Sequence, residues 1–390
     1  MSVRFAATAR ARRDRILLAI LALALIVSAC SSTHGDRARG PTPGTSSTAS
    51  PTPTGSKTPA AFSGNVYANA LSGHFSPAVS GITERVYVPD SSGNTVWVID
   101  PKTYKVTSQT VPANELQHVT PAWDLSKLYV DDAGTGALTV IDPRTGLIGK
   151  TIRNVPDPYN LYFTPDGSKA IVVAEEKRRL DFRNPRTWKL IKSVGIPWAG
   201  VDHMDFTADG RYLLTSTEYA GVLVKVDTVT MRIDGTIRVG GKPIDVRLAP
   251  DGKVFYVPNQ GRNGVSIVDP ETMKEIKFIR TGRGAHGVVV SRDTKRFYVS
   301  NRLAGTISVI DLAHRRVVAT WNVGGSPDML QVSPDGRHLW ASNRFDASVV
   351  VVDTETGRIE KVIHLGGTPH GLCYFPQPGR ISIGHNGVYR

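Results

Sequence analysis

The protein has 390 residues, of which 40% are hydrophobic, and its formal net charge is +13. That hydrophobic fraction is sufficient for a buried core, so a globally disordered chain is excluded. The two cysteines exclude a disulfide scaffold and a multi-cysteine zinc module.

The first 29 residues have the pattern of a secretory signal. Five arginines and one aspartate precede a twelve-residue apolar run from Ile16 to Val27. The run is shorter than the about 20 residues that a membrane-spanning helix needs. A basic start, a short apolar run and small residues after it predict an exported protein. The sequence leaves the Sec and Tat export routes open.

The apolar run ends in Val27-Ser28-Ala29-Cys30, which resembles the lipobox of bacterial lipoproteins. The resemblance implies removal of residues 1–29 and attachment of a diacylglycerol to the sulfur of Cys30. The alternative is ordinary signal-peptidase cleavage near Ala29. Because two or more acyl chains hold a protein stably on a bilayer, we expect a lipid-anchored protein on the extracytoplasmic face of a bacterial cell membrane.

Residues 30–61 continue as a Ser-, Thr- and Pro-rich stretch, which predicts a tether between the anchor and a folded domain over 62–390. The predicted signal carries a charge of +4 and the tether +2, which leaves +7 for residues 62–390. Because nearly half of the basic charge lies outside the folded domain, a nucleic-acid partner is disfavoured.

From residue 62 onward the sequence repeats itself. An alternating apolar strand that ends in an acidic or amide residue occurs seven times, at spacings of 42 or 43 residues. The seven end positions are Asp100, Asp142, Asn184, Asp227, Asp269, Asp311 and Asp353. Turn signals such as Pro250-Asp251-Gly252 recur at the same period, and each precedes another strand. Each repeat therefore has room for four short strands, which predicts an all-β fold, a β-propeller of four-stranded blades.

The strands resemble the YVTN-type, YncE-like β-propeller repeat over about residues 74–386. The resemblance is carried by Tyr256-Val257-Pro258-Asn259, Tyr298-Val299-Ser300-Asn301 and Gly324-Gly325-Ser326-Pro327. Its motifs indicate a fold and say little about activity. The family includes surface-layer and periplasmic propellers and is similar, at a distance, to the haem-binding propeller of nitrite reductases and to propeller lactonases.

The number of blades stays open between seven and eight. Seven repeats are complete, and the segments 65–70 and 371–386 are left over at the two ends. If these two segments share one additional split blade, with 65–70 as its outer strand, the ring has eight blades, which we favour slightly. The family resemblance implies seven. We expect Cys373 to be a buried small apolar residue of an inner strand.

Aligning the repeats places a ring of imidazoles and carboxylates at one mouth of the central channel. His118, Asn160, His203 and Asp245 share one register, and Asp202, His286, Asp328 and His370 occupy the neighbouring one. The candidate ligand or metal site therefore consists of His118, His203, Asp245, His286, Asp328 and His370. Such groups suit a divalent metal, although propeller channels are commonly lined with polar side chains in any case.

No recognised catalytic motif is present. The sequence has no Gly-x-Ser-x-Gly elbow, no His-Glu-x-x-His and no Cys-x-x-Cys-His haem attachment site. We therefore expect a membrane-anchored binding scaffold for an extracytoplasmic protein or small ligand, without catalysis and with no evident cofactor. The alternative is a channel-centred enzyme or cofactor protein that uses a divalent metal, a noncovalent haem or lactone hydrolysis.

Overall fold

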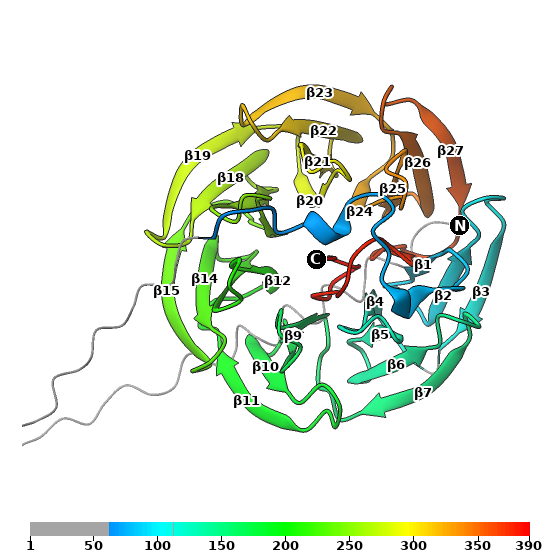
Figure 1. The fold of residues 1–390 in the computed structure, drawn as a ribbon, viewed down its shortest axis with the longest axis horizontal. Coiled ribbons are helices and arrows are strands. Elements are labelled where there is room, and N and C mark those ends of the chain that lie inside the picture. Colours follow the sequence, from blue (N-terminus) through cyan, green and yellow to red (C-terminus); the bar gives the residue numbers. More distant parts are fainter. Residues whose placement is uncertain (1–61, 112) are drawn as a thin grey trace, which may run out of the picture. The chain divides into compact units, whose positions relative to one another are not determined.

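The computed structural model describes residues 62–111 and 113–390, which form a β-propeller of seven four-stranded antiparallel blades around a central channel (Figure 1). The predicted signal, Cys30 and the tether lie outside these residues. Within the described part of the chain, the helices are too short and too polar to cross a membrane.

Each blade is a meander whose first strand lies at the channel and whose fourth lies at the rim. Blade 1 contains β28 (Cys373–Phe375), β1 (Arg85–Pro89), β2 (Thr95–Ile99) and β3 (Val106–Thr110). Blade 2 contains β4 (Leu116–Pro121), β5 (Leu128–Asp132), β6 (Ala137–Ile141) and β7 (Ile148–Arg153). Blade 3 contains β8 (Asn160–Phe163), β9 (Ala170–Ala174), β10 (Arg179–Arg183) and β11 (Leu190–Gly195).

The other four blades repeat this order. Blade 4 contains β12 (Val201–Phe206), β13 (Tyr212–Thr217), β14 (Val222–Asp227) and β15 (Arg232–Arg238). Blade 5 contains β16 (Arg247–Leu248), β17 (Phe255–Asn259), β18 (Gly264–Asp269) and β19 (Lys274–Arg280). Blade 6 contains β20 (Ala285–Val290), β21 (Arg296–Asn301), β22 (Thr306–Asp311) and β23 (Arg316–Asn322). Blade 7 contains β24 (Pro327–Val332), β25 (His338–Asn343), β26 (Ser348–Asp353) and β27 (Ile359–His364).

Seven acidic or amide residues define the repeat. Each of them forms part of the turn that leads into the outer strand of its blade. Each follows or ends the third strand of its blade, and its side-chain oxygen accepts a hydrogen bond from a backbone N–H two or three residues later. The bond is 2.8 Å long at Asp100, 2.9 Å at Asn184 and 2.7 Å at Asp311. Because Asp and Asn form this turn with their own side chain, the period of the sequence matches the period of the fold.

The ring is closed by a strand from the other end of the sequence. β28 pairs antiparallel with β1, with Val86 opposite Tyr374 and Tyr87 opposite Cys373. The expected split blade therefore exists, but it is one of the seven, so the slight preference for eight blades was wrong. Asp100, the first of the seven repeat ends, follows a strand of this blade, so the blade is already one of the seven. Its inner strand comes from the C-terminal part of the chain. Cys373 is fully buried in that inner strand, as expected.

The segment 65–70 is not an outer strand. It leads into the short 3-10 helix η1 (Ala68–Ala70), and η2 (Pro77–Val79) follows. Val66 N–H donates to Pro250 O at 2.9 Å, and the Tyr67 hydroxyl donates to Leu248 O at 2.8 Å. We call the side of the ring where the inner strands end the exit face, and this segment covers part of it.

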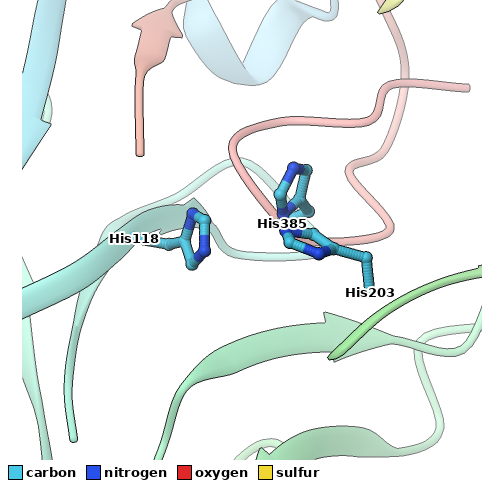
Figure 2. A group of neighbouring side chains, drawn as sticks. All are labelled: His118, His203 and His385. Atoms are coloured by element: carbon cyan, nitrogen blue, oxygen red, sulfur yellow. The ribbon is translucent and has the colours of Figure 1, made fainter. Parts of the chain in front are cut away.

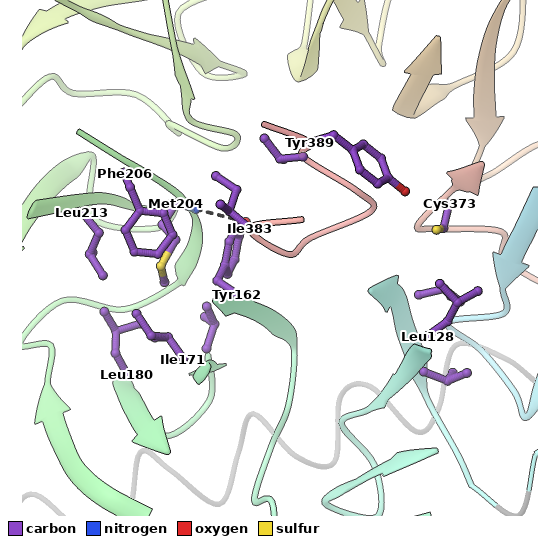
Figure 3. Close-up of a cluster of buried hydrophobic side chains, with 14 of the residues drawn as sticks. Leu128, Tyr162, Ile171, Leu180, Met204, Phe206, Leu213, Cys373, Ile383 and Tyr389 are labelled. Carbon is purple, nitrogen blue, oxygen red and sulfur yellow. Dashed lines mark hydrogen bonds between the residues drawn. The ribbon is translucent and has the colours of Figure 1, made fainter. Parts of the chain in front are cut away.

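Residues 376–390, which we call the tail, leave β28 on the exit face and turn back into the channel. Figure 1 shows the C-terminus at the centre of the ring. Ile383 and Tyr389 of the tail belong to the largest buried apolar cluster, together with Tyr162, Met204 and Phe206 of blades 3 and 4 (Figure 3). The second leftover segment therefore fills the channel and adds no further blade.

Leu372, at the entrance to β28, tests the contribution of ring closure to stability. It is fully buried among residues of blades 1 and 7. We expect Leu372→Ala to lower the free energy of unfolding by about 2–5 kcal/mol, measured by urea denaturation, because it removes buried methyl groups and leaves a cavity. The matched control is Leu303→Ala, because Leu303 is 56% exposed. The control should change stability by no more than about 0.5 kcal/mol. Equal losses in the two variants would contradict this account of closure.

Candidate functional site

The predicted site residues all lie where the inner strands begin. His118 is on β4, His203 on β12, His286 on β20 and Asp328 on β24, while Asp245 precedes β16 and His370 precedes β28. Each of the six is at most 3% exposed. The structure divides them into two groups and leaves Asp245 apart from both.

The first group, which we call the histidine cluster, contains His118, His203, His370 and His385. The ring centroids of His118 and His370 are 4.6 Å apart, those of His118 and His385 are 4.9 Å apart, and those of His203 and His385 are 4.6 Å apart. Figure 2 shows His118 and His203 on different blades, with His385 reaching them from the tail. One ring nitrogen from each of His118, His203 and His385 lies within 4.8 Å of the other two.

His385 was absent from the predicted site. The alignment of repeats assigns positions only within blades, and His385 lies beyond the last repeat. The available signal was the sequence Gly384-His385-Asn386-Gly387, two polar residues between glycines in a segment without a partner strand. Gly384 adopts a φ of 105°, and a Cβ there would lie 2.4 Å from Leu161 O. Only glycine therefore lets this turn enter the channel and present His385.

Hydrogen bonds donated by Nδ1 orient two of the imidazoles, and a carboxylate lies beside the Nδ1 atom of a third. His118 Nδ1 donates to Asn386 Oδ1 at 3.0 Å, and His370 Nδ1 donates to Gln117 Oε1 at 2.9 Å. His203 Nδ1 lies 2.5 Å from Asp202 Oδ1. When Nδ1 carries the proton, the Nε2 lone pair is available to a ligand, which is how metal-binding histidines are commonly held.

The Nε2 atoms of His118, His203 and His370 are buried and have no hydrogen-bond partner among residues 62–111 and 113–390. A buried polar atom without a partner costs about 1–3 kcal/mol. His370 Nε2 lies 3.8 Å from Asp328 Oδ2, but the Nε2 atoms of His118 and His203 are unfavourable unless something occupies the space between them. A group the size of an ion or a water molecule would satisfy them.

Burial keeps most of the cluster neutral. It lowers the pKa of His118, His370 and His385 well below the ordinary value, and the neighbouring histidines lower it further. Burial opposes protonation of His203 too, but the charge and hydrogen bond of Asp202 outweigh it, so the pKa of His203 is raised. Neutral imidazoles with free lone pairs are the form that binds a metal ion.

The second group, which we call the aspartate cluster, surrounds Asp328. His286 Nδ1 lies 2.9 Å from Asp328 Oδ1, and the guanidinium of Arg302 contacts the same carboxylate. Burial alone would raise the pKa of Asp328, but Arg302 and His286 hold it well below the usual range. Burial and Arg302 lower the pKa of His286 to about 4, so this histidine is neutral at physiological pH. The aspartate cluster is internally paired, which is typical of a structural ion network.

The two clusters meet at His370, whose Nε2 lies 3.8 Å from Asp328 Oδ2. Asp245 contacts neither cluster. Its carboxylate accepts a hydrogen bond from Val288 N–H at 3.0 Å and lies 3.4 Å from Arg247 Nη2. These contacts join blade 5 to blade 6. Asp245, which aligns with His118 and His203 in the repeat, therefore holds two blades together.

Three acidic residues on blades 3 and 4, Glu175, Asp202 and Glu218, lie near the histidine cluster. Burial, together with the negative charges of Asp202 and Glu218, raises the pKa of Glu175 to about 8. Burial and Asp202 also raise the pKa of Glu218. Glu175 is therefore mostly protonated at neutral pH, and a cation bound nearby would favour its ionised form.

Gly371 allows the tail and blade 2 to approach each other. A Cβ at this position would lie 2.7 Å from Asn386 Oδ1 and 2.8 Å from His118 Nδ1. We expect Gly371→Ala to displace one of these two groups and to destabilise the protein by about 1–3 kcal/mol in thermal or urea unfolding.

The matched control for this substitution is Gly195→Ala on β11, where a Cβ would meet nothing within 4 Å. It should leave stability within about 0.5 kcal/mol of the unmodified protein. A Gly371→Ala protein as stable as this control would show that the contact between His118 and Asn386 is looser than the structure indicates.

Comparisons with solved structures show the fold. A functionally unknown protein from Desulfotomaculum acetoxidans aligns with a TM-score of 0.65 at 16% identity, covering 74% of this chain and 98% of that one. A putative 6-phosphogluconolactonase from Bacteroides fragilis aligns with a TM-score of 0.62 at 16% identity, covering 76% and 99%. The dihydro-haem d1 dehydrogenase NirN aligns with a TM-score of 0.58 at 17% identity, covering 78% and 77%.

At these identities the likeness extends to architecture alone. A comparison with curated proteins found no match. The family model of YNCE-like β-propellers matches residues 58–378, which include all seven blades. The chain therefore belongs to the YNCE-like β-propeller family.

Proposed function

We propose that this protein is a lipid-anchored, extracytoplasmic propeller that binds a transition-metal ion in its channel. The observation that carries the proposal is the convergence of buried imidazoles from two blades and the tail, with the Nε2 atoms of His118 and His203 left without partners among the described residues. Metal binding makes use of those lone pairs, which no protein group among the described residues engages.

The chemistry of the donors limits the ion. Imidazole suits Zn²⁺, Cu²⁺, Ni²⁺ and Fe²⁺, whereas Ca²⁺ and Mg²⁺ prefer oxygen ligands. Tetrahedral zinc holds imidazole nitrogens at about 2.0–2.1 Å, and therefore about 3.3 Å from one another. The three nitrogens lie within 4.8 Å of one another, so each pair would need to approach by up to about 1.5 Å. Asp202 contacts the ring of His203 and Asn386 that of His118, so these two are the positioning residues.

The proposal favours an ion over a larger cofactor. The tail occupies the channel, and a cavity beside it, lined by Tyr67, Arg247 and Tyr389, has a volume of about 30 Å³. That is the space of about one water molecule. A noncovalent haem would require the tail to leave. A pocket of about 550 Å³ lies between blades 2 and 3, but none of the channel histidines lines it. Binding of an ion by those histidines is therefore the function that we propose.

Metal binding can be tested on the full-length protein purified without a polyhistidine tag. We expect one Zn²⁺ or Co²⁺ per chain by elemental analysis, with visible Co²⁺ absorbance. The double variant His118→Ala, His203→Ala should bind at least about 100-fold more weakly, because it removes two of the three proposed ligands.

The matched control is the double variant His314→Ala, His364→Ala, because both of these histidines are exposed at the rim. It should bind as the unmodified protein does. Absence of stoichiometric metal in the unmodified protein would overturn the proposal, as would equal affinity in the two double variants.

The lipid anchor is a separate part of the proposal and rests on the sequence around Cys30. Cys30→Ala removes the sulfur that would carry the diacylglycerol. We expect this variant to leave the membrane fraction in cell fractionation, because lipid attachment is the proposed contact with the bilayer. Ser31→Ala, one residue later, should stay in the membrane fraction. If the Cys30→Ala protein still sediments with membranes at full yield, the anchor proposal is wrong.

A further inference from the structure

The tail enters the channel as a tight turn that is held by several backbone contacts. Phe163 N–H donates to Ile383 O at 3.0 Å, and His385 N–H donates to Leu161 O at 2.8 Å. Ser382 N–H donates to Trp123 O at 3.1 Å. These bonds fix the turn against blades 2 and 3 at the level of the histidine cluster.

Side chains hold the turn from other blades. Gln331 Nε2 on β24 donates to Asn386 O at 3.1 Å and to Gly387 O at 3.2 Å. Arg390 Nη2 lies 2.7 Å from Asp205 Oδ1 on β12. The tail therefore contacts blades across the ring, and its position depends on the whole propeller.

Two tail side chains interact directly with the histidine cluster. His385 is one of the three histidines with converging nitrogens, and Asn386 contacts two imidazoles. Its Oδ1 accepts from His118 Nδ1 at 3.0 Å, and its Nδ2 lies 3.2 Å from His385 Nε2. Without the tail, blades 2 and 4 would present only His118 and His203.

His385 also adopts a backbone conformation that side chains rarely take. Its φ is 55°, in the left-handed region, between two glycines with φ above 100°. A non-glycine residue held there costs about 1–3 kcal/mol and persists only when surrounding contacts maintain it, and such residues cluster at ligand sites.

His370 is the alternative third ligand, and its position disfavours it. Its Nε2 faces the aspartate cluster, 3.8 Å from Asp328 Oδ2. The group of nitrogens that lie within 4.8 Å of one another contains His385 and does not contain His370. His385 is therefore the third histidine of this group. Its Nδ1 lies 3.0 Å from Asn160 Nδ2 and its Nε2 lies 3.2 Å from Asn386 Nδ2, so coordination of an ion would replace one of these amide contacts.

We infer that the tail supplies the third ligand of the metal site, so that metal binding and docking of the tail in the channel stabilise each other. This inference rests on the proposed function and adds its regulation. Because coupling between two equilibria is reciprocal, an ion that binds only the docked state suppresses opening of the tail. At a free ion concentration of 100 times Kd, the open population falls about 100-fold.

Hydrogen–deuterium exchange on the full-length protein tests the inference, with Zn²⁺ at 100 times Kd compared with EDTA. We expect exchange of the backbone amides in 382–390 to slow by up to about 100-fold with Zn²⁺. Amides of β18 and β19, on blade 5, serve as the internal control and should exchange equally in both conditions.

The variant His385→Gln should retain a folded propeller, lose at least about 10-fold in Zn²⁺ affinity, and show tail exchange that no longer responds to Zn²⁺. His364→Gln, at an exposed position on β27, is the matched control and should behave as the unmodified protein.

The outcomes separate the two proposals. If one Zn²⁺ binds through His118 and His203 but tail exchange is unchanged and His385→Gln binds normally, the tail is not part of the site. The inference then fails while the proposed function stands. If no Zn²⁺ binds at all, both fail.

Discussion

A four-stranded blade has two apolar faces and cannot cover either by itself, and this constraint governs the rest of the structure. Each blade becomes stable only between two neighbours, so the stack must continue until it closes on itself. Closure requires the last blade to contact the first, and here it is secured by β28, which comes from the far end of the sequence and pairs with β1. Without that strand, blade 1 would expose the inner edge of β1 to the channel.

The same closure determines where polar groups gather. Inner strands from seven blades begin around one axis, so equivalent positions of the repeat face one another across the channel although they are 42 or 43 residues apart in sequence. Residues such as His118 and His203 are then buried far from bulk water. Burial lowers the pKa of His118, whereas the negative charges of Asp202 and Asp245 raise that of His203. The fold thus produces neutral imidazoles with accessible lone pairs, which is the chemical state that a metal ion requires.

The tail gives the site its asymmetry. Seven similar blades would surround the axis with similar groups. Here, however, the histidine cluster lies on one side of the axis and the aspartate cluster on the other. The turn at Gly384 reaches blades 2, 3 and 4, and Asn386 bridges two imidazoles there. The channel is therefore occupied by the protein's own chain on the exit face, and the histidine cluster lies where that chain meets the inner strands.

The sequence by itself determined the local architecture, because its signals are local. Asp and Asn at fixed spacing make turns with their own side chains, and alternation defines the strands, so the repeat, the four-stranded blade and the channel position of His118 or Asp328 follow from pattern alone. Tertiary structure decided what depends on distant contacts. The partner of β1 lies almost 290 residues away, so seven blades and eight were equally compatible with the repeats. His385 lies outside every repeat. Asp245 aligns with the histidines of the channel in sequence, but its carboxylate contacts Val288 and Arg247. No spacing rule describes a tail that folds back into the channel, because its place is set by contacts with blades 2, 3, 4 and 7.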